Sequence, residues 1–403
     1  MDAFKNLRVI SFSFGAAGPY FGSILAQLGA EVIQVETMNR LDWCRTDLDP
    51  ITRKPLGINQ SLLFNDLNTN KLSITLNLRD PRALDIAKRL IKTCDIMIES
   101  YSPLTIDRLG LGYDVVKEIN PSIVMLSSST SGRSGPEMRV VGYAAIFAAA
   151  GGFGELTGYV DGPPSEVRGT TDLVSAFAMT VPLFAALIHR QRTGEGQYID
   201  YSSREAIICC IGDSLMNYSM NGIIDTRSGN WDDVMVPHNC YRCKGSDKWV
   251  SIAVANDEEW QALCRAMGNP EWAKEEKFSN PLHRWENQVE LDKLIEAWTM
   301  HYTSYEVMHT LQKAGVAAIP SMTGEDMFSD PHLEKRKAYH ISVNPEAGAR
   351  MSISCPWGHM SATPSRAVRD APALGEHNEY IYKKILGLSS EEFDKLTEEK
   401  VFY

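Results

Sequence analysis

A strand, a tight turn, a helix and a second strand open this chain, in an order that constrains its fold. The mainly apolar segment 7–12 predicts a buried strand, and the glycines of segment 15–19 mark a turn. A helix is predicted over 20–28, Gly29 ends it, and residues 31–35 predict a second strand. This βαβ order is typical of a parallel sheet with helices on both faces.

The alternation of strands and helices continues through the first half of the chain. Further strand patterns occur at 73–76, 95–98, 123–127 and 198–201. Helical patterns occur at 81–94, 113–119, 144–150, 173–188 and 205–217. We therefore predict an α/β fold with a Rossmann-like, doubly wound parallel sheet.

A polar, turn-rich segment at 225–230 separates this pattern from a different one. Two predicted strands, 239–243 and 249–253, precede helical patterns at 257–267, 288–298 and 304–314. Because 403 residues exceed what one core usually serves, two domains are expected. We predict a large domain at 1–224, a smaller α+β domain at 225–330, and a return to the large domain at 331–403 with a final helix at 376–386.

Composition excludes several classes of protein. A net charge of −11 argues against non-specific nucleic-acid binding, which needs a basic surface. The N-terminus has no apolar signal core, and the apolar runs 144–150 and 177–188 are too short to span a bilayer. The eight scattered cysteines indicate reduced thiols. A cytoplasmic protein without a membrane partner is therefore expected.

Asp172 stands directly before the apolar stretch 173–188. An aspartate at this place can cap the helix by accepting a hydrogen bond from a backbone N–H group of the first turn. The positive end of the helix would also keep its carboxylate ionised, as a nucleophile requires. The local pattern favours the cap. The motifs of serine hydrolases, P-loop nucleotide hydrolases and zinc proteases are absent from the sequence.

Other candidate sites are weaker. The turn at 15–19 lacks the three spaced glycines of a dinucleotide-binding fingerprint. Arg45, Lys71 and Arg108 lie near the carboxyl ends of predicted strands, where they could bind a polyphosphate or be ordinary surface charges. Cys240 and Cys243 would point to opposite faces of a strand, so no metal site is predicted.

A series of short phrases occurs in a fixed order along nearly the whole chain. These phrases cover residues 17–19, 28–36, 67–73, 107–113, 156–158, 161–164, 192–197, 314–316, 330–331 and 371–377, together with Asp42 and Arg45. In this order they resemble the class III CoA-transferases, the family of formyl-CoA transferase and carnitine CoA-transferase.

The resemblance implies that Asp172 is the catalytic nucleophile. It would attack an acyl-CoA thioester, form a mixed anhydride and then carry CoA as its own thioester. No permanently bound cofactor is implied, because CoA and acyl-CoA are substrates, and the second substrate is a carboxylic acid. The implied contacts to CoA are Ala16, Ala17, Gly18, Arg45, Leu67, Asn70, Lys71, Arg108 and, for the 3′-phosphate, Arg139.

The chain departs from the family pattern at several positions. Thr37 stands where a basic residue is frequent, with Arg40 as a substitute, and Ala144 stands where an aspartate is frequent. The glycine-rich loop of formyl-CoA transferases is absent, and residues 228–230 are the nearest candidate. The resemblance also implies an interlocked dimer, formed with an identical chain or with a related subunit.

Two alternatives share this fold. A 2-methylacyl-CoA racemase needs a histidine near 142–145, and none is present. The chain could also be one subunit of a heteromeric transferase. Segment 237–243 with Trp249 resembles transferases for aryl-succinates, so succinyl-CoA as donor and a benzylsuccinate-like acid as acceptor are the expected substrates.

Overall fold

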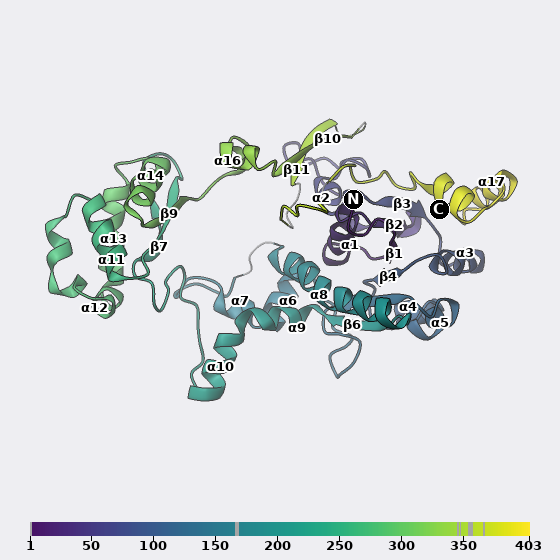
Figure 1. Cartoon of the computed structure of the whole chain (residues 1–403), viewed down its shortest axis with the longest axis horizontal. Helices are drawn as coiled ribbons and strands as arrows, with labels where there is room; N and C mark the ends of the chain where they lie inside the picture. Colours follow the sequence, from purple (N-terminus) through teal and green to yellow (C-terminus); the bar gives the residue numbers. More distant parts are fainter. Residues whose placement is uncertain (1, 166–168, 345, 347, 354–357, 366) are drawn as a thin grey trace. The chain divides into compact units, whose positions relative to one another are not determined.

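The main sheet has six parallel strands in the order β3-β2-β1-β4-β5-β6 (Figure 1). The computed structural model describes residues 2–165, 169–344, 346, 348–353, 358–365 and 367–403. The strands are β1 (Arg8–Phe12), β2 (Glu31–Glu36), β3 (Leu72–Thr75), β4 (Ile96–Glu99), β5 (Val124–Ser129) and β6 (Tyr198–Ser202). The predicted α/β fold with a parallel sheet is confirmed. The strand order reverses between β1 and β4, where open sheets of this kind bind ligands.

Alternate side chains of each strand enter two cores, one on each face of the sheet. In β1, Ile10 and Phe12 enter one core and Val9 enters the other. Burial on both faces explains why the strands are continuous apolar runs in the sequence. The main helices of the first core are α3 (Pro81–Ile91) and α5 (Tyr113–Ile119), and those of the second are α1 (Ala17–Gln27) and α8 (Thr170–Thr193).

Short helices connect these elements. The single helix predicted over 205–217 is divided into three pieces in the structure. The short helices are η1 (Met38–Arg40), η2 (Trp43–Arg45), α2 (Leu62–Leu67), α4 (Thr105–Arg108), α6 (Ala144–Ala150), α7 (Phe153–Leu156), α9 (Ser203–Ile208), η3 (Cys209–Ile211) and α10 (Gly212–Asn221).

Helix α8 spans 24 residues and extends beyond the apolar run 177–188 on both sides. By length and composition alone it could cross a membrane, a test that the core helix of a soluble protein also passes. It buries Met179 and Leu183 in the core next to the sheet, while Val181 and Ile188 are exposed. Only part of this helix is therefore covered within the chain.

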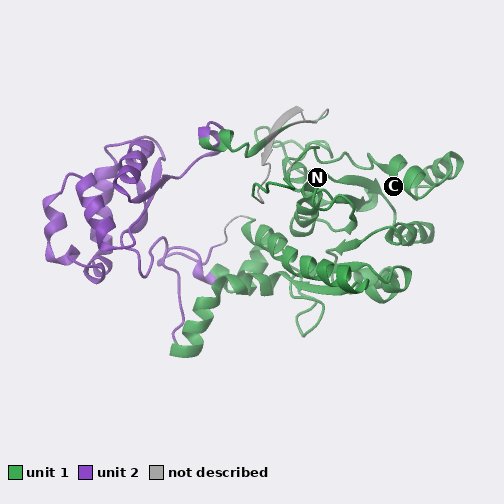
Figure 2. Cartoon of the chain, in the orientation of Figure 1, with its two compact units in different colours: residues 1–154, 166–222, 332–403 green, residues 155–165, 223–331 purple. Residues whose placement is uncertain are grey.

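The chain separates into two compact units (Figure 2). The large unit is Met1–Gly154, Glu166–Gly222 and His332–Tyr403, and the small unit is Glu155–Ser165 and Ile223–Pro331. The sequence pattern did not reveal that segment 155–165 belongs to the small unit. The side chain of Arg227 attaches it there, because it donates hydrogen bonds to the carbonyl oxygens of Glu155 and Gly162, at 3.2 Å each.

The small unit packs helices on one face of a three-stranded antiparallel sheet. Strands β7 (His238–Arg242) and β8 (Trp249–Ala253) form the predicted pair, and β9 (Ala317–Pro320), which was not predicted, adds to β8. Tyr241 and Trp260 are among the buried residues of its core. Its helices are α11 (Asp257–Ala266), η4 (Glu271–Lys274), η5 (Glu276–Phe278), α12 (Pro281–Glu286), α13 (Gln288–Thr299), α14 (Ser304–Ala314) and α15 (Gly324–Phe328), and α16 (Pro331–Lys335) begins at its last residue.

The C-terminal part differs from the predicted helix at 376–386. Strands β10 (Tyr339–Asn344) and β11 (Gly348–Ile353) pair with each other, and the π-helical segment η6 (Tyr380–Ile385) and helix α17 (Ser390–Glu398) follow. Gly387, with φ 72°, separates these two helices. The hydroxyl of Tyr382 donates to the carbonyl oxygen of Thr75 at 2.8 Å, and its ring stacks on Phe402. The C-terminal segment is thereby attached to β3.

Candidate active site

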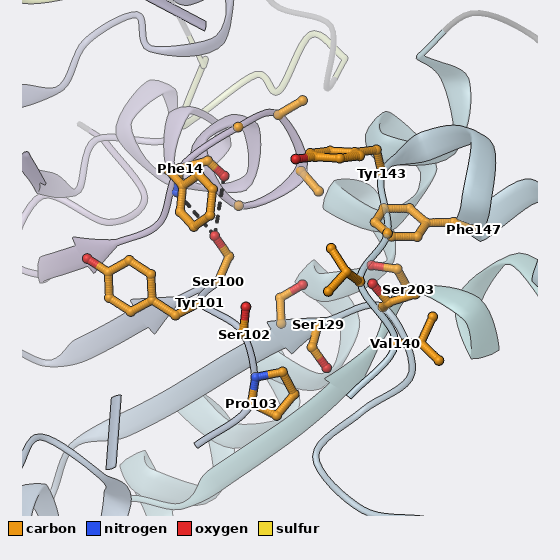
Figure 3. Close-up of a pocket in the computed structure, with 18 of the residues that line it drawn as sticks. Phe14, Ser100, Tyr101, Ser102, Pro103, Ser129, Val140, Tyr143, Phe147 and Ser203 are labelled. Carbon is orange, nitrogen blue, oxygen red and sulfur yellow. Dashed lines mark hydrogen bonds between the residues drawn. The ribbon is translucent and has the colours of Figure 1, made fainter. Parts of the chain in front are cut away.

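A cavity of about 500 Å³ lies in the large unit at the carboxyl ends of β1, β4, β5 and β6 (Figure 3). It includes the point between β1 and β4 where the strand order reverses. Residues 14–18, 100–104, 128–130 and 139–143 line it, together with Arg40, Trp43, Arg108, Phe147, Asp172 and Ser203.

The turn after β1 is held to the segment around η2. The backbone N–H of Gly15 donates to both carboxylate oxygens of Asp42, at 3.0 and 3.2 Å. Gly15 has φ 80°, and a Cβ atom on it would lie 3.2 Å from the indole nitrogen of Trp43, so glycine suits this position. Burial first, and then the charges of Asp42 and Asp172 among others, raise the pKa of the Cys44 thiol. The first turn, η2 and Asp172 are therefore neighbours.

Asp172 is not the N-cap residue of helix α8. The helix begins at Thr170, and Gly169 occupies the N-cap position with φ 67°. The expectation of a cap is therefore wrong, because the glycine allows a left-handed N-cap conformation three residues earlier than the pattern suggested. Asp172 lies in the first turn of α8 and lines the cavity as a half-buried side chain. The positive end of the helix still favours a carboxylate there.

Two hydrogen bonds fix the beginning of α8. The hydroxyl of Thr171 donates to the carbonyl oxygen of Ala144 at 2.8 Å. One turn further, the carbonyl oxygen of Ser175 accepts a hydrogen bond of 2.9 Å from the hydroxyl of Tyr201 in β6. The backbone of Asp172 is therefore held between α6 and the sheet, which gives its carboxylate a defined place in the cavity.

Hydroxyl side chains line the cavity where β5 and β6 end. Ser129 is paired with Ser202 in the sheet. The backbone N–H of Arg204 donates to the carbonyl oxygen of Thr130 at 2.9 Å. This bond brings Ser203 next to the end of β5. Ser128, Ser129, Thr130 and Ser203, which we call the hydroxyl wall, thus come from two adjacent strand ends.

Three residues of the hydroxyl wall are buried and Ser129 is half-buried, and their hydroxyl groups have no hydrogen-bond partner among the described residues. The exposed fractions are 1% for Ser203, 5% for Ser128 and 7% for Thr130. The Oγ atom of Ser129 is buried without a hydrogen bond, and the other three hydroxyls form none within the described residues. A buried polar group without a partner costs about 1–3 kcal/mol. Such a group in a cavity indicates a bound ligand or water.

Aromatic side chains form a different part of the lining. The rings of Trp43 and Tyr143 meet edge to face, with centroids 6.4 Å apart, and both residues are exposed. Phe147 is a buried residue that also lines the cavity. Phe14 and Tyr101 form a second pair at 5.9 Å. The cavity therefore offers apolar surface as well as hydroxyl groups.

Three arginines and one carboxylate, Asp172, are the ionic groups of the described lining. The guanidinium of Arg40 lies over the ring of Phe14 at 5.1 Å. Arg108 donates to the carbonyl oxygen of Leu104 at 3.2 Å, and Arg139 is exposed. A second cavity of about 200 Å³, which shares Arg40, opens over the ends of β2 and β3. The excess of positive charge suits an anionic ligand.

The structure brings six of the predicted site residues together. Asp172, Ala16, Ala17, Gly18, Arg108 and Arg139 all line the cavity. The other four predicted contacts, Arg45, Leu67, Asn70 and Lys71, are buried in the body of the large unit and do not line it.

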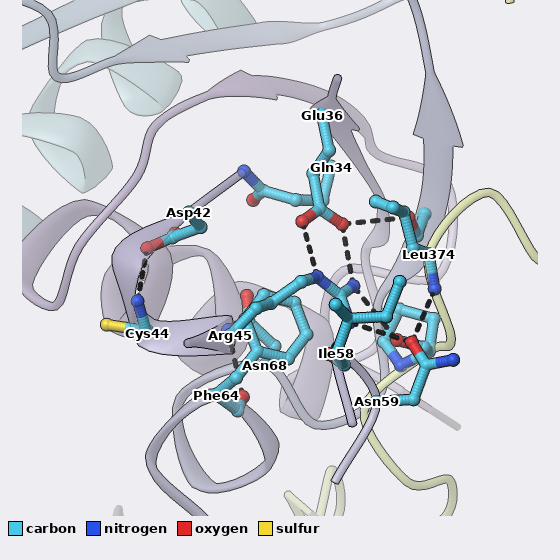
Figure 4. A network of polar contacts seen from close by, with 12 residues as sticks. Gln34, Glu36, Asp42, Cys44, Arg45, Ile58, Asn59, Phe64, Asn68 and Leu374 are labelled. Atoms are coloured by element: carbon cyan, nitrogen blue, oxygen red, sulfur yellow. Dashed lines mark hydrogen bonds and ion pairs between the residues drawn. The ribbon is translucent and has the colours of Figure 1, made fainter. Parts of the chain in front are cut away.

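Arg45 is bound within the protein (Figure 4). Its guanidinium forms two hydrogen bonds with Glu36, at 2.7 and 2.8 Å, and lies over the ring of Phe64 at 3.5 Å. Further bonds reach the side chain of Asn59 and the carbonyl oxygen of Pro372, at 3.1 and 3.2 Å. With its side chain fully buried, Arg45 holds the segments around the cavity together and does not face it.

Lys71 and Asn70 also face inward. The ammonium of Lys71 donates to the carbonyl oxygen of Pro19 at 2.6 Å and to Oδ1 of Asn68 at 2.7 Å. Burial lowers the pKa of Lys71 to about 7. Asn70, with φ 65°, accepts hydrogen bonds from the backbone of residues 368–369, and Leu67 belongs to a small apolar core. A positive charge near a strand end was a misleading signal here, because sequence does not show which side of the chain it faces.

No group of three metal-binding side chains occurs among the described residues. Cys240 lies in β7 and contacts Ser251, whereas Cys243 directly follows that strand and enters the core of the small unit. The described lining of the cavity contains no histidine, so the histidine of a racemase is missing there as well.

The sequence reasoning missed several lining residues. Trp43, Tyr143 and Phe147 gave no signal, because single aromatic residues occur in any core. The hydroxyl wall, in contrast, did leave a signal in the sequence. Residues 127–131 are four serines and a threonine at the carboxyl end of a predicted strand, and a run of hydroxyls at such a place could have been noticed.

A model of CoA-transferase family III matches residues 4–378. The chain belongs to this family. It is 33% identical over 402 residues, 98% of this chain and 97% of the relative, to a succinyl-CoA–D-citramalate CoA-transferase of Chloroflexus aurantiacus. It is 30% identical over 399 residues, with 98% and 97% covered, to the beta subunit of a succinyl-CoA–L-malate CoA-transferase of the same organism.

The fold agrees with this assignment. A crystal structure of a CAIB/BAIF family protein from Brucella suis superposes with a TM-score of 0.85 at 28% identity, over 95% of this chain and 99% of that protein. The expected family is thus confirmed, and the chain is a class III CoA-transferase enzyme that acts on acyl-CoA thioesters.

Proposed function

We propose that this enzyme moves CoA from succinyl-CoA to a dicarboxylic acid through a covalent thioester on Asp172. The observation that carries the proposal is the position of Asp172. It is the acidic residue of the described cavity lining, it lies in the first turn of α8, and it shares the cavity with three arginines and the first turn of the sheet.

The first half of the reaction loads CoA onto the enzyme. A carboxylate oxygen of Asp172 attacks the thioester carbon of succinyl-CoA, and the CoA thiolate leaves, which yields a mixed anhydride. The thiolate then attacks the carbonyl carbon of Asp172, forming an aspartyl-CoA thioester and releasing succinate. The backbone N–H groups of the first turn of α8 are suitable donors for the oxyanions of these steps.

The second half repeats these steps in reverse order with the acceptor. A carboxylate of the incoming acid attacks the aspartyl thioester and expels the CoA thiolate, which gives a new mixed anhydride. The thiolate attacks the acceptor carbonyl carbon, so acceptor-CoA leaves and the carboxylate of Asp172 is regenerated. Each step exchanges one acyl bond for another, which preserves the energy of the thioester.

The cationic side of the cavity suits the phosphates of CoA. Arg40, Arg108 and Arg139 are proposed as phosphate contacts, because guanidinium groups bind phosphate in a bidentate manner. Ala16, Ala17 and Gly18 are proposed to border the pantetheine arm, since their small side chains leave the backbone accessible.

The acceptor is proposed to be a dicarboxylic acid, and an aryl-succinate such as benzylsuccinate is the specific candidate. Citramalate and malate, in the names of the two relatives above, are dicarboxylic acids. The exposed rings of Trp43 and Tyr143 provide the apolar surface that an aryl group would need.

The enzyme is proposed to act as an interlocked dimer, with an identical chain or a related subunit as partner. Helix α10 buries none of its own residues, and Leu215, Met216, Tyr218 and Met220 are exposed on it. Apolar surface of this extent is typical of a subunit interface. The free cysteines of the described chain agree with a proposed cytoplasmic location.

The test is Asp172→Ala, compared with Asp114→Ala. Asp114 also lies in the first turn of a helix, α5, but is exposed and outside the cavity. The first variant should lose CoA transfer by at least about a thousandfold, and the second should keep it. Hydroxylamine should inactivate the parent enzyme only after incubation with succinyl-CoA alone. Unchanged transfer by Asp172→Ala would refute the mechanism.

A further inference from the structure

The hydroxyl wall is a group of buried donors that the proposed chemistry at Asp172 does not use. Ser128 and Ser129 are the last residues of β5, Thr130 follows it and Ser203 follows β6, all on the lining of one cavity. We propose that this wall binds the free, non-reacting carboxylate that succinyl-CoA and the dicarboxylic acceptor have in common. The inference rests on the proposed function and names the subsite that would make the enzyme selective for dicarboxylic acids.

The side chains of the hydroxyl wall have little contact with bulk solvent. Ser203 is 1% exposed and Thr130 is 7% exposed, so each is shielded almost completely except toward the cavity that both line. Neither hydroxyl has a hydrogen-bond partner in the part of the chain that the structure describes, and the buried Oγ of Ser129 has none either. Unpaired donors on a cavity surface are suited to a ligand oxygen.

The two segments that carry the hydroxyl wall are fixed to each other. The carbonyl oxygen of Thr130 accepts the backbone N–H of Arg204 at 2.9 Å, so the segments carrying Thr130 and Ser203 are joined directly. A Cβ atom added to Gly142 would lie 2.9 Å from the hydroxyl oxygen of Thr130. The glycine therefore leaves the space that this side chain occupies. Donors on two joined strand ends are preorganised.

The donors and charges of the cavity lining favour a carboxylate as the ligand of the hydroxyl wall. Hydroxyl groups could also bind an amide of the pantetheine arm, but a carboxylate accepts up to about four hydrogen bonds and so matches several neighbouring donors. Asp172 is the acidic group of the described lining, against three arginines. A second anionic group of the substrate therefore meets little electrostatic repulsion from the described lining.

The same subsite would serve both halves of the exchange. Succinate must leave before the acceptor enters, and both acids react through one carboxylate while the other stays ionised. A wall that binds the second carboxylate would orient the first one toward the aspartyl thioester in each half-reaction.

Two matched pairs of variants test the proposal. Thr130→Val keeps the shape but removes the hydroxyl, whereas Thr130→Ser keeps the hydroxyl. Ser203→Ala and Ser203→Thr form the second pair, and Ser390→Ala, which alters an exposed hydroxyl on α17, is the control for handling. The substrates are succinyl-CoA and butyryl-CoA, which differ in that a methyl group replaces the terminal carboxylate.

The measurement is kcat/KM for each donor, with labelled succinate or butyrate as the acceptor. Thr130→Val and Ser203→Ala should each lower the value for succinyl-CoA by about 10- to 100-fold and leave the value for butyryl-CoA within about twofold. Thr130→Ser and Ser203→Thr, which keep the hydroxyl group, should retain most of the parent's preference for succinyl-CoA. Folding is checked by the butyryl-CoA reaction, which uses the rest of the cavity.

Equal losses with both donors would overturn the inference and would instead indicate that the wall binds the pantetheine arm. An unchanged preference in all four variants would overturn it as well. If hydroxylamine traps no aspartyl thioester in the parent enzyme, the proposed function itself fails. If trapping succeeds and the variants do not discriminate, only the subsite is refuted.

Discussion

Lys71 donates a hydrogen bond of 2.6 Å to the carbonyl oxygen of Pro19, from the side of the first turn that faces away from the cavity. Its ammonium also reaches Oδ1 of Asn68 at 2.7 Å and Oε1 of Gln34 at 3.4 Å. The amide of Gln34 in turn donates to the carbonyl oxygen of Ser13, just before the turn. Lys71 therefore supports the cavity turn from behind, although it does not line the cavity.

Replacing Lys71 by methionine should weaken binding of acyl-CoA. The carbonyl oxygen of Pro19 would lose its buried partner, and the adjoining turn at 14–18 would shift. An unpaired buried acceptor costs about 1–3 kcal/mol, so we expect KM for acyl-CoA to rise about tenfold, with kcat within about threefold. Steady-state kinetics measure both values. Lys274→Met, which removes an exposed lysine of the small unit, should change neither. An unaltered KM in Lys71→Met would contradict a supporting role.

The stability of the protein should depend on pH through Lys71. Burial lowers its pKa from the ordinary 10.5 to about 7 in the folded state. Between these values the unfolded state binds more protons, so the free energy of unfolding rises with pH, by up to about 1.4 kcal/mol per unit. The contribution is complete above the unfolded pKa and is lost as pH falls to about 7.

Urea unfolding at pH 7.5, 8.5 and 9.5 measures this effect. As pH rises, the free energy of unfolding of the parent should increase relative to that of Lys71→Met, because the variant lacks the titrating group. Other residues titrate in both proteins and cancel in the difference. A difference that does not change with pH would show that Lys71 keeps an ordinary pKa.

The ion pair of Arg45 and Glu36 should contribute strongly to stability. Both side chains are buried, and two hydrogen bonds join them. Arg45→Met would leave the carboxylate of Glu36 buried without its cation, which costs about 3–5 kcal/mol. Arg82→Met breaks an exposed pair with Asp80 and should cost less than about 1 kcal/mol. Chemical denaturation of both variants gives the comparison, and equal losses would argue against this role for Arg45.

Much of the fold follows from local patterns in the sequence. The βαβ opening and the helix α14 (Ser304–Ala314) were predictable because apolar spacing, glycines and caps agree there. Strand β9 has only four residues, two of them exposed, and leaves almost no periodic signal. The C-terminal segment was not predictable for a related reason, since its position depends on contacts with β3 that are distant in sequence.

The site was predictable only in part. Asp172 and the small residues at 16–18 were identified through the family resemblance, and the structure brings them into one cavity. Arg45 and Lys71 have the same charge as Arg108 and lie near strand ends as well. Whether such a residue faces a ligand or a buried partner is decided by the side of the loop on which it lies. A sequence does not contain that information in a local pattern.

The exposed apolar surface of α8 and α10 should be the site of subunit association. Val181 on α8 is 72% exposed and Met216 on α10 is 60% exposed. Neither residue belongs to the described lining of the cavity. A charge there would be desolvated on association, so Val181→Asp and Met216→Asp should each weaken the dimer at least about tenfold. Val115→Asp, on the exposed side of α5, is the matched control and should associate like the parent. Sedimentation velocity over a dilution series measures the dissociation constant. A parent protein that is monomeric at micromolar concentration, or variants that remain dimeric at the parent's affinity, would exclude this surface as the interface.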